Sequence, residues 1–305
     1  MERIKAYNTI LVTGGTGFLG SRLVLFLLKK GIKVVVIHRK DSPLQRLENI
    51  EEKYRKQLFL WDISKKKLTS LFTTYRIEGI IHTATAYGRN EELASGIVES
   101  NVIFPLRLLE LAIFYKVKFF INADTFFNER MGFSQSEGIY VKTKKFFLLL
   151  AKDMIQSSSL KFINMVIYQM YGPGDAKHKF IPFILSHFLN NSENVDLTSG
   201  MQKRDFIYVD DVVESFISAT EQYVQFDQFE EFQIGTGKGY TIKSVVHALK
   251  RKSGSTTHCL WGALPQRPNE IMSAIARIKE NRKLKWKSRV SLDEGMSKTV
   301  KFFKE

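Results

Sequence analysis

Three glycines near the N-terminus constrain the fold of this chain more than any other feature of its sequence. They recur every third residue from Gly14 to Gly20, between an apolar run at 10–13, typical of a buried strand, and a segment at 21–30 that is typical of a helix. Such a turn needs glycine where the backbone bends, where it approaches a pyrophosphate, and where helix packs on strand. A second apolar strand at 32–37 completes a βαβ unit, so the helix N-terminus would face phosphate groups. The residues expected to bind a dinucleotide here are Gly14, Thr16, Gly17, Phe18, Leu19 and Gly20.

The end of the second strand indicates which dinucleotide is bound. A carboxylate at this position would bind the ribose 2′-hydroxyl of NAD, but the strand runs into His38, Arg39 and Lys40. Two cations suit the 2′-phosphate of NADP, and Arg39 is the better bidentate partner. We therefore expect NADP(H) as cofactor rather than NAD(H), with Arg39 and Lys40 at the phosphate; the alternative is that both are ordinary surface charges.

Strands and helices alternate through the first half of the chain. This alternation predicts an α/β fold with a doubly wound parallel sheet of the Rossmann type. The pattern changes to shorter, mixed elements after a turn cluster at 171–175. We expect a dinucleotide-binding domain at 1–168, to which about 205–225 returns, and a smaller C-terminal substrate-binding lobe at 169–305, with the site between them. Further strands are expected at 58–61, 79–86, 117–122, 162–167 and 206–209, and helices at 71–76, about 96–115 and 138–155.

Composition narrows the partners and the compartment. The formal net charge is +15, but the basic residues are scattered and no recognition motif accompanies them, so we expect no nucleic-acid partner. No apolar run is long enough to span a bilayer, and no signal peptide precedes the first strand. The single cysteine, Cys259, cannot form an internal disulfide, which fits a reducing cytoplasm. No metal ion is expected.

Tyr140 and Lys144 form the candidate catalytic pair. They are one helical turn apart on one face of the helix expected at 138–155. Because a nearby ammonium favours tyrosinate, Lys144 is expected to lower the pKa of Tyr140 from its usual value of about 10. Tyr140 could then exchange a proton with a carbonyl or hydroxyl oxygen while hydride moves at the same carbon. Such a pair is also common by chance on a solvated helix face, but its place two elements after the nucleotide-binding strand strengthens the prediction.

Together these motifs resemble the extended short-chain dehydrogenase/reductase family, in its sugar-nucleotide epimerase/dehydratase group. The similarity covers nearly the whole chain and includes the segments at 171–174 and 204–211. Within the family, the segments at 122–127 and 266–272 look most similar to NADPH-dependent 4-keto reductases that make 3,6-dideoxyhexose nucleotides. The resemblance implies that Asp62 and Ile63 lie at the adenine and that further cofactor contacts come from Thr83, Ala84, Thr85, Asn101, Tyr140 and Lys144. It implies a substrate site made by Tyr87, Thr125, Gln169, Arg204 and Arg267, in which the two arginines bind the diphosphate.

The chain departs from the family pattern at three positions. Ala123 stands where the family usually has Ser or Thr, so we expect Thr125, on the same side of the strand, to supply the missing hydroxyl. The 4,6-dehydratases carry an Asp-Glu pair here; this chain keeps Asp124 but has Thr125 in place of Glu, which argues against dehydration. Gln169 replaces the usual asparagine.

Three functions remain open from the sequence. The first is an NADPH-dependent 4-reductase acting on a nucleotide 4-keto-6-deoxyhexose. The second is a redox-neutral epimerase that holds NAD tightly, and the third is a cofactor-binding sensor without catalysis. The apolar helices at about 96–115 and 138–155 also predict a homodimer that pairs them across a two-fold axis.

Overall fold

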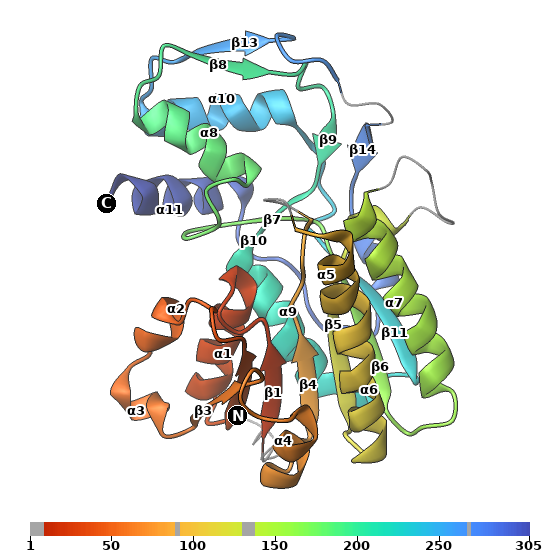
Figure 1. The fold of residues 1–305 in the computed structure, drawn as a ribbon. Coiled ribbons are helices and arrows are strands. Elements are labelled where there is room, and N and C mark those ends of the chain that lie inside the picture. The colour runs from red at the N-terminus through yellow and green to blue at the C-terminus, as the bar shows by residue number, and fades with distance from the viewer. Residues whose placement is uncertain (1–8, 89–91, 130–137, 267–269) are drawn as a thin grey trace. The chain divides into compact units, whose positions relative to one another are not determined.

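Seven strands form one parallel sheet, which confirms the predicted α/β Rossmann-type fold. The structure is a computed structural model and describes residues 9–88, 92–129, 138–266 and 270–305 (Figure 1). The strand order is β11-β6-β5-β4-β1-β2-β3, so the order reverses between β1 and β4. In open α/β sheets, ligands bind beyond the carboxyl ends of the strands at such a reversal. The strands are β1 (Ile10–Thr13), β2 (Val34–His38), β3 (Leu58–Asp62), β4 (Gly79–His82), β5 (Phe119–Thr125), β6 (Lys161–Ile167) and β11 (Phe229–Ile234).

Helices cover both faces of this sheet because the strands are apolar on both sides. On one face, Leu11, Ile80 and Phe120 join a core with residues of α4, α6 and α7. On the other face α1 packs so closely that a Cβ on Gly15 would lie 2.7 Å from Val36 and 3.3 Å from Val24. The helices are α1 (Phe18–Lys29), α2 (Gln45–Glu48), α3 (Glu52–Arg55), α4 (Leu68–Thr74), α5 (Ala94–Val98), α6 (Phe104–Phe114), α7 (Ile139–Ile155) and α9 (Val209–Gln222), with short 3₁₀ turns at η2 (Phe126–Glu129) and η3 (Tyr223–Gln225).

The long helix expected at about 96–115 is interrupted by a π-helical turn, η1 (Glu99–Ile103), between α5 and α6. Pro105, near the start of α6, has no N–H to donate, and Asn101 within the turn uses its side chain on another segment. The strand expected at 79–86 ends at His82, because the N–H groups of Ala84 and Ala86 bond to side chains instead of a neighbouring strand. Strand β11 was not predicted.

The chain divides into two compact units, each with its own core. The first comprises residues 1–166, 213–232 and 282–285, and the second comprises 167–212, 233–281 and 286–305. In the second unit, α10 begins at an N-cap, Thr241, that accepts the Ser244 N–H, and it ends at Gly254, whose φ is 75°. Its elements are β7 (Gln169–Tyr171), β8 (Asn194–Leu197), β9 (Lys203–Arg204), β10 (Phe206–Tyr208), β12 (Tyr240–Thr241), β13 (His258–Trp261), β14 (Ser273–Ala274), α8 (Phe180–Leu189), α10 (Ile242–Ser253), η4 (Ile278–Glu280) and α11 (Leu292–Lys304).

Candidate functional site

The glycine turn lies at the point where the strand order reverses. Gly14 has φ of 68°, and a Cβ there would lie 2.6 Å from the Ala84 backbone nitrogen. A Cβ on Gly20 would lie 2.1 Å from the Gly14 carbonyl oxygen, and the Gly17 N–H donates to that same oxygen at 2.9 Å. Both positions therefore exclude side chains so that the turn can pass between β4 and α1.

The N-terminus of α1 follows this turn directly. Gly17 is its N-cap, and among the described residues no side chain caps it and no acidic residue lies in its first turn. The first N–H groups of a helix lack partners within the helix, and their dipoles favour negative charge. Leu19 is buried, whereas Thr16 and Phe18 are half-buried. The arrangement suits a phosphate group, which is the role expected of this segment.

Strands β2 and β3 bring the next predicted residues together. His38 lies opposite Asp62 in the ladder, and Arg39 and Lys40 follow as exposed side chains. Asp62 accepts hydrogen bonds from the Ser64 hydroxyl at 2.6 Å and the Ser64 N–H at 2.9 Å, and these lower the pKa of its carboxyl. The Ile63 N–H donates to the His38 carbonyl oxygen at 3.1 Å.

The segment after β4 is held by Asn101 of the π-helical turn. The Asn101 amide accepts from the Ala86 N–H at 2.8 Å and from the Thr85 hydroxyl at 3.2 Å, and it donates to the Ala86 carbonyl oxygen at 2.8 Å. It also donates to the Thr143 hydroxyl of α7 at 3.1 Å. Asn101 therefore joins the segment predicted to contact cofactor to the helix that carries the candidate catalytic pair. Thr83 is anchored separately, through its hydroxyl, to the Thr13 carbonyl oxygen at 2.8 Å.

The candidate catalytic pair occupies the first turns of α7. The ring of Tyr140 packs against that of Tyr87, with centroids 4.9 Å apart. Lys144 is only 4% exposed, and its Nζ donates to the Ala123 carbonyl oxygen at 2.6 Å. Burial lowers the pKa of Lys144, while the charge of Asp124 acts in the opposite direction. Thr125 ends β5 as a buried residue whose hydroxyl accepts from the Phe127 N–H at 3.4 Å.

His82, at the end of β4, is a buried group whose environment the sequence did not reveal. It is 1% exposed among the rings of Phe104, Phe120 and Phe147, and its Nδ1 lies 2.7 Å from the Thr13 hydroxyl. Burial, and then the charge of Lys144, lower the pKa of His82 from 6.5 to about 3. The ring is therefore neutral at physiological pH.

The second unit holds Gln169 and Arg204. Gln169 on β7 pairs with Phe206 on β10, and its N–H donates to the Asp205 carbonyl oxygen at 2.9 Å. The Arg204 guanidinium is buried, pairs with Glu270, and donates to the Ile271 carbonyl oxygen at 2.5 Å. Burial lowers the pKa of Arg204. Arg267 lies outside the described residues, as do the other positions of 267–269.

The pairing of Arg204 with Glu270 was missed because the two are 66 residues apart in sequence. Asp205 was also missed as an organising residue. Its buried carboxylate accepts from the N–H and hydroxyl of Thr236 at 2.9 and 2.6 Å, and from the N–H groups of Gly237 and Ala276 at 2.8 and 3.2 Å. It thereby joins the loop at 236–237 and the segment just after β14 to the segment that carries Arg204.

A comparison with models of known protein families shows to which family the chain belongs. The model of the NAD dependent epimerase/dehydratase family matches residues 10–235. The chain belongs to this family. Its members are pyridine-nucleotide-dependent enzymes that act on nucleotide sugars, so the resemblance expected from the sequence is confirmed.

Individual members of the epimerase/dehydratase family match this chain over nearly its whole length. The chain is 34% identical to the CDP-abequose synthase of Salmonella typhimurium, over 99% of both chains. It is 25% identical to the UDP-glucose 4-epimerase of Thermotoga maritima solved with UDP-glucose, with a TM-score of 0.83 over 97% of this chain and 98% of the other. The fold also matches that of the UDP-glucose 4-epimerase of Thermus thermophilus in complex with NAD, with 24% identity and a TM-score of 0.80 over 97% and 98%.

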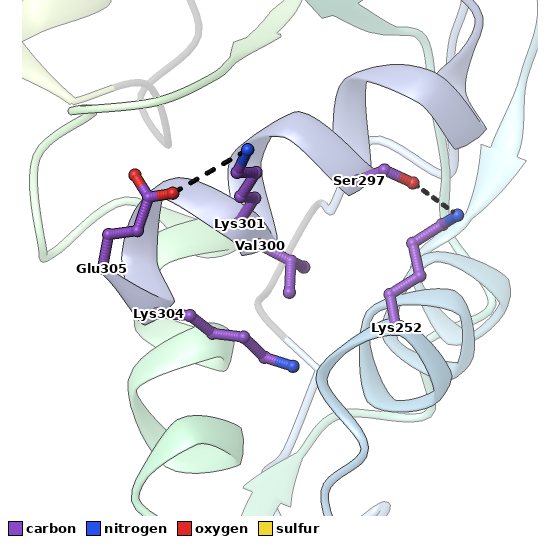
Figure 2. Close-up of a pocket in the computed structure, with 6 residues that line it drawn as sticks. All are labelled: Lys252, Ser297, Val300, Lys301, Lys304 and Glu305. Atoms are coloured by element: carbon purple, nitrogen blue, oxygen red, sulfur yellow. Dashed lines mark hydrogen bonds and ion pairs between the residues drawn. The ribbon is translucent and has the colours of Figure 1, made fainter.

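The structure also shows a hollow outside the predicted site, and its helices bear on whether the chain could span a membrane. A hollow of about 410 Å³ between α10 and α11 is lined by lysines, but Lys252 is paired with Ser297 and Lys301 with Glu305 (Figure 2). None of the predicted site residues that the structure describes lines it. Across the described part of the chain, no helix combines the length and apolar character needed to cross a membrane.

Proposed function

We propose that the chain catalyses the NADPH-dependent reduction of the 4-keto group of a nucleotide-linked 4-keto-6-deoxyhexose, as a CDP-abequose synthase-like enzyme of deoxysugar biosynthesis for cell-surface polysaccharide. The observation that carries the proposal is the 34% identity to a CDP-abequose synthase over 99% of both chains. This sequence identity is higher than the 25% identity to the UDP-glucose 4-epimerase of Thermotoga maritima. The reaction would take place in the cytoplasm.

The residues of the first unit fit a dinucleotide. The glycine turn leads directly into a helix N-terminus that no side chain in the described part of the chain caps, and this end provides N–H donors for a pyrophosphate. The exposed Arg39 and Lys40 would bind the 2′-phosphate, and Asp62 would lie near the adenine. When bound, NADPH supplies the hydride. In this proposal, the dinucleotide-binding domain is 1–168 with about 205–225.

Within the proposed reaction, Tyr140 donates the proton that the 4-keto oxygen needs once the carbon is reduced. The Lys144 cation on the next turn favours loss of that proton from the phenol. A second donor must position the oxygen, and we assign this role to Thr125 because Ala123 has no hydroxyl. The backbone of residue 123 is nevertheless used, since its carbonyl oxygen anchors Lys144.

The substrate diphosphate is assigned to Arg204, Gln169 and Arg267 of the lobe at 169–305, and Tyr87 is assigned to the substrate as the family resemblance implies. Arg204 is already desolvated and engaged by Glu270, so a diphosphate would replace a carboxylate on the same guanidinium. We also propose a homodimer formed through α6 and α7. Phe146 and Leu149 of α7 are 47% and 56% exposed, and Phe114 at the end of α6 is 76% exposed.

A redox-neutral epimerase is the alternative, and its support is the similarity to UDP-glucose 4-epimerases, one of them in complex with NAD. One experiment separates the two reactions. The purified protein is incubated with NADPH and with CDP-, GDP- and dTDP-linked 4-keto-6-deoxyhexoses, and the loss of NADPH absorbance and the product configuration are followed. We expect stoichiometric NADPH consumption with one substrate. In a parallel incubation with UDP-glucose, which carries the C4 hydroxyl that an epimerase inverts, formation of its C4 epimer without NADPH consumption, from protein that retains NAD through purification, would establish the alternative.

A further inference from the structure

The positive charge of Lys144 is buried, and the one hydrogen bond that its ammonium makes to a carbonyl oxygen does not offset the lost hydration. An ammonium group that is 4% exposed has lost most of its hydration, and the Ala123 carbonyl to which it donates carries only a dipole. Buried cations are costly unless a counter-charge offsets the lost solvation. Burial accordingly lowers the pKa of Lys144. A catalytic lysine that lost its proton would no longer assist Tyr140, so the fold needs a negative charge nearby.

Asp124 supplies that charge. It follows Ala123 in β5, is itself 5% exposed, and acts to raise the pKa of Lys144. Its Oδ1 accepts from the Thr125 N–H at 2.8 Å and from the Asn128 amide at 2.6 Å, and its Oδ2 accepts from the Asn164 amide at 2.9 Å. Three donors on two oxygens hold the carboxylate in place and complement its negative charge.

The donors are themselves held in a buried network. Asn164 on β6 is 0% exposed, accepts from the Asn122 amide at 2.7 Å, and donates to Glu231 of β11 at 2.9 Å as well as to Asp124. The network spans three neighbouring strands of the sheet. Both carboxylate oxygens of Asp124 and both amide groups of Asn164 are bonded in this network, whereas the buried amide oxygens of Asn122 and Asn128 have no hydrogen-bond partner among the described residues. The Asp124 carboxylate is therefore held by the Asn164 amide of the neighbouring strand β6.

We propose that Asp124 is a positioning residue whose carboxylate keeps the buried Lys144 amine in its ammonium form beside Tyr140. The proposal deepens the proposed function, because the charge of Lys144 matters where Tyr140 transfers a proton. Among the charged and titratable groups that act on Lys144, His82 stays neutral because its pKa is about 3. Glu231 is exposed and reaches Asp124 only through Asn164. Asp124 thus provides the counter-charge that burial of Lys144 requires.

The direction in which the Tyr140 titration shifts when Asp124 is replaced tests this proposal. The ultraviolet absorbance of tyrosinate is titrated for the parent and for Asp124→Asn, and Tyr140 is isolated by difference from the corresponding Tyr140→Phe proteins. If Asp124 acts through Lys144, its loss leaves Lys144 neutral and moves the Tyr140 titration upward by about 1 pH unit or more. If Asp124 acted on Tyr140 directly, removing a negative charge would move the titration downward. A downward or absent shift overturns the proposal.

Two controls keep the test independent of stability. Glu231→Gln removes the other carboxylate of the network, and we expect it to leave the Tyr140 titration unchanged; an equal shift in both variants would overturn the proposal. Lys144→Met is combined with Asp124→Asn, which removes both buried charges together and avoids leaving one unpaired. In the Lys144→Met background, Asp124→Asn should no longer raise the Tyr140 titration. An upward shift there would show that Asp124 does not act through Lys144.

The titration requires no substrate, so its outcome is separate from the proposed function. A chain that reduces no 4-keto sugar but shows the upward shift would retain the role of Asp124 and lose the proposed reaction. Where a substrate is found, Asp124→Asn is expected to lower kcat about tenfold or more while the KM for NADPH changes little. A purely structural role would change both constants, or neither, without moving the titration.

Discussion

Acid is expected to destabilise this protein through one buried histidine. His82 has a pKa of about 3 in the folded chain, against 6.5 when the ring is fully hydrated in the unfolded chain, because it is buried among aromatic side chains beside Lys144. A histidine whose pKa falls on folding gains its proton only when the chain unfolds. The unfolded state therefore binds more protons between pH 3 and 6.5, and stability falls as the pH decreases through this window.

The size of the effect follows from the two pKa values. Well below pH 6.5 the free energy of unfolding is expected to fall by about 1.4 kcal/mol per pH unit from this group alone. Between about pH 7 and about pH 5 the loss sums to about 2 kcal/mol. Above pH 7 the contribution is negligible, because His82 is neutral in both states.

The perturbation that isolates this contribution is His82→Gln, which cannot take up a proton and keeps an amide group that can bond the Thr13 hydroxyl. Urea unfolding of parent and variant is measured at about pH 7 and about pH 5, and carboxylates that titrate in both proteins cancel in the comparison. His258→Gln, at an exposed histidine of β13, controls for the loss of one histidine. The parent should lose about 2 kcal/mol more than His82→Gln between the two pH values.

The absolute stability of His82→Gln does not decide the question, because any packing cost applies at both pH values. Equal acid sensitivity in parent and variant would refute the reasoning, since it would mean that His82 is either hydrated or already charged in the folded chain. A larger loss in the variant would refute it too.

Three further predictions concern the cofactor, the reaction and the assembly. Arg39→Ala is expected to weaken NADPH binding roughly 10- to 100-fold and NADH binding little, measured by fluorescence titration; equal losses would contradict the assignment to the 2′-phosphate. Tyr140→Phe should nearly abolish turnover while NADPH still binds, and Thr125→Val should lower kcat about 10²- to 10³-fold, whereas full activity of Thr125→Val would leave it only a strand residue. Ala123→Ser should be neutral or mildly harmful, and a strong gain in activity would instead favour a weakened catalyst or sensor. Leu149→Glu should convert the proposed homodimer to monomers in light scattering at micromolar concentration, and a parent that is already monomeric there would refute the dimer.

The sheet could be predicted because its determinants are local. The glycine spacing from Gly14 to Gly20 dictates a strand–turn–helix on its own, and each apolar run between turn residues indicates one strand. Strand β11 was not predicted because its sequence at 229–234 contains two adjacent glutamates. Only Phe232, Gln233 and Ile234 of this strand are buried. A strand at the edge of a sheet needs no continuous apolar run, so composition gives little signal for it.

The candidate site was predictable in its residue types and less so in its contacts. Tyr140 and Lys144 follow from helical spacing, but that Lys144 donates to the Ala123 carbonyl depends on how α7 packs against β5. Asn101 stays a predicted cofactor contact, and the structure adds that its amide joins the segment after β4 to Thr143. Contacts of this kind connect residues 15 to 42 positions apart, and spacing along one helix or strand carries no information about them.

The carboxyl end of β5 shows how one strand separates two roles that a related chemistry would combine. Side chains alternate along a strand, so Asp124 points away from the side shared by Ala123 and Thr125. A carboxyl that protonates a leaving hydroxyl must reach its substrate, yet both oxygens of Asp124 are bound by Thr125, Asn128 and Asn164. Thr125 stands where the 4,6-dehydratases carry their second acidic residue, so the strand offers a hydroxyl on one side and a buried carboxylate on the other. That division suits the addition of a hydride and a proton to a carbonyl, which needs one donor and a persistently charged lysine, better than the elimination of water, which needs a mobile acid.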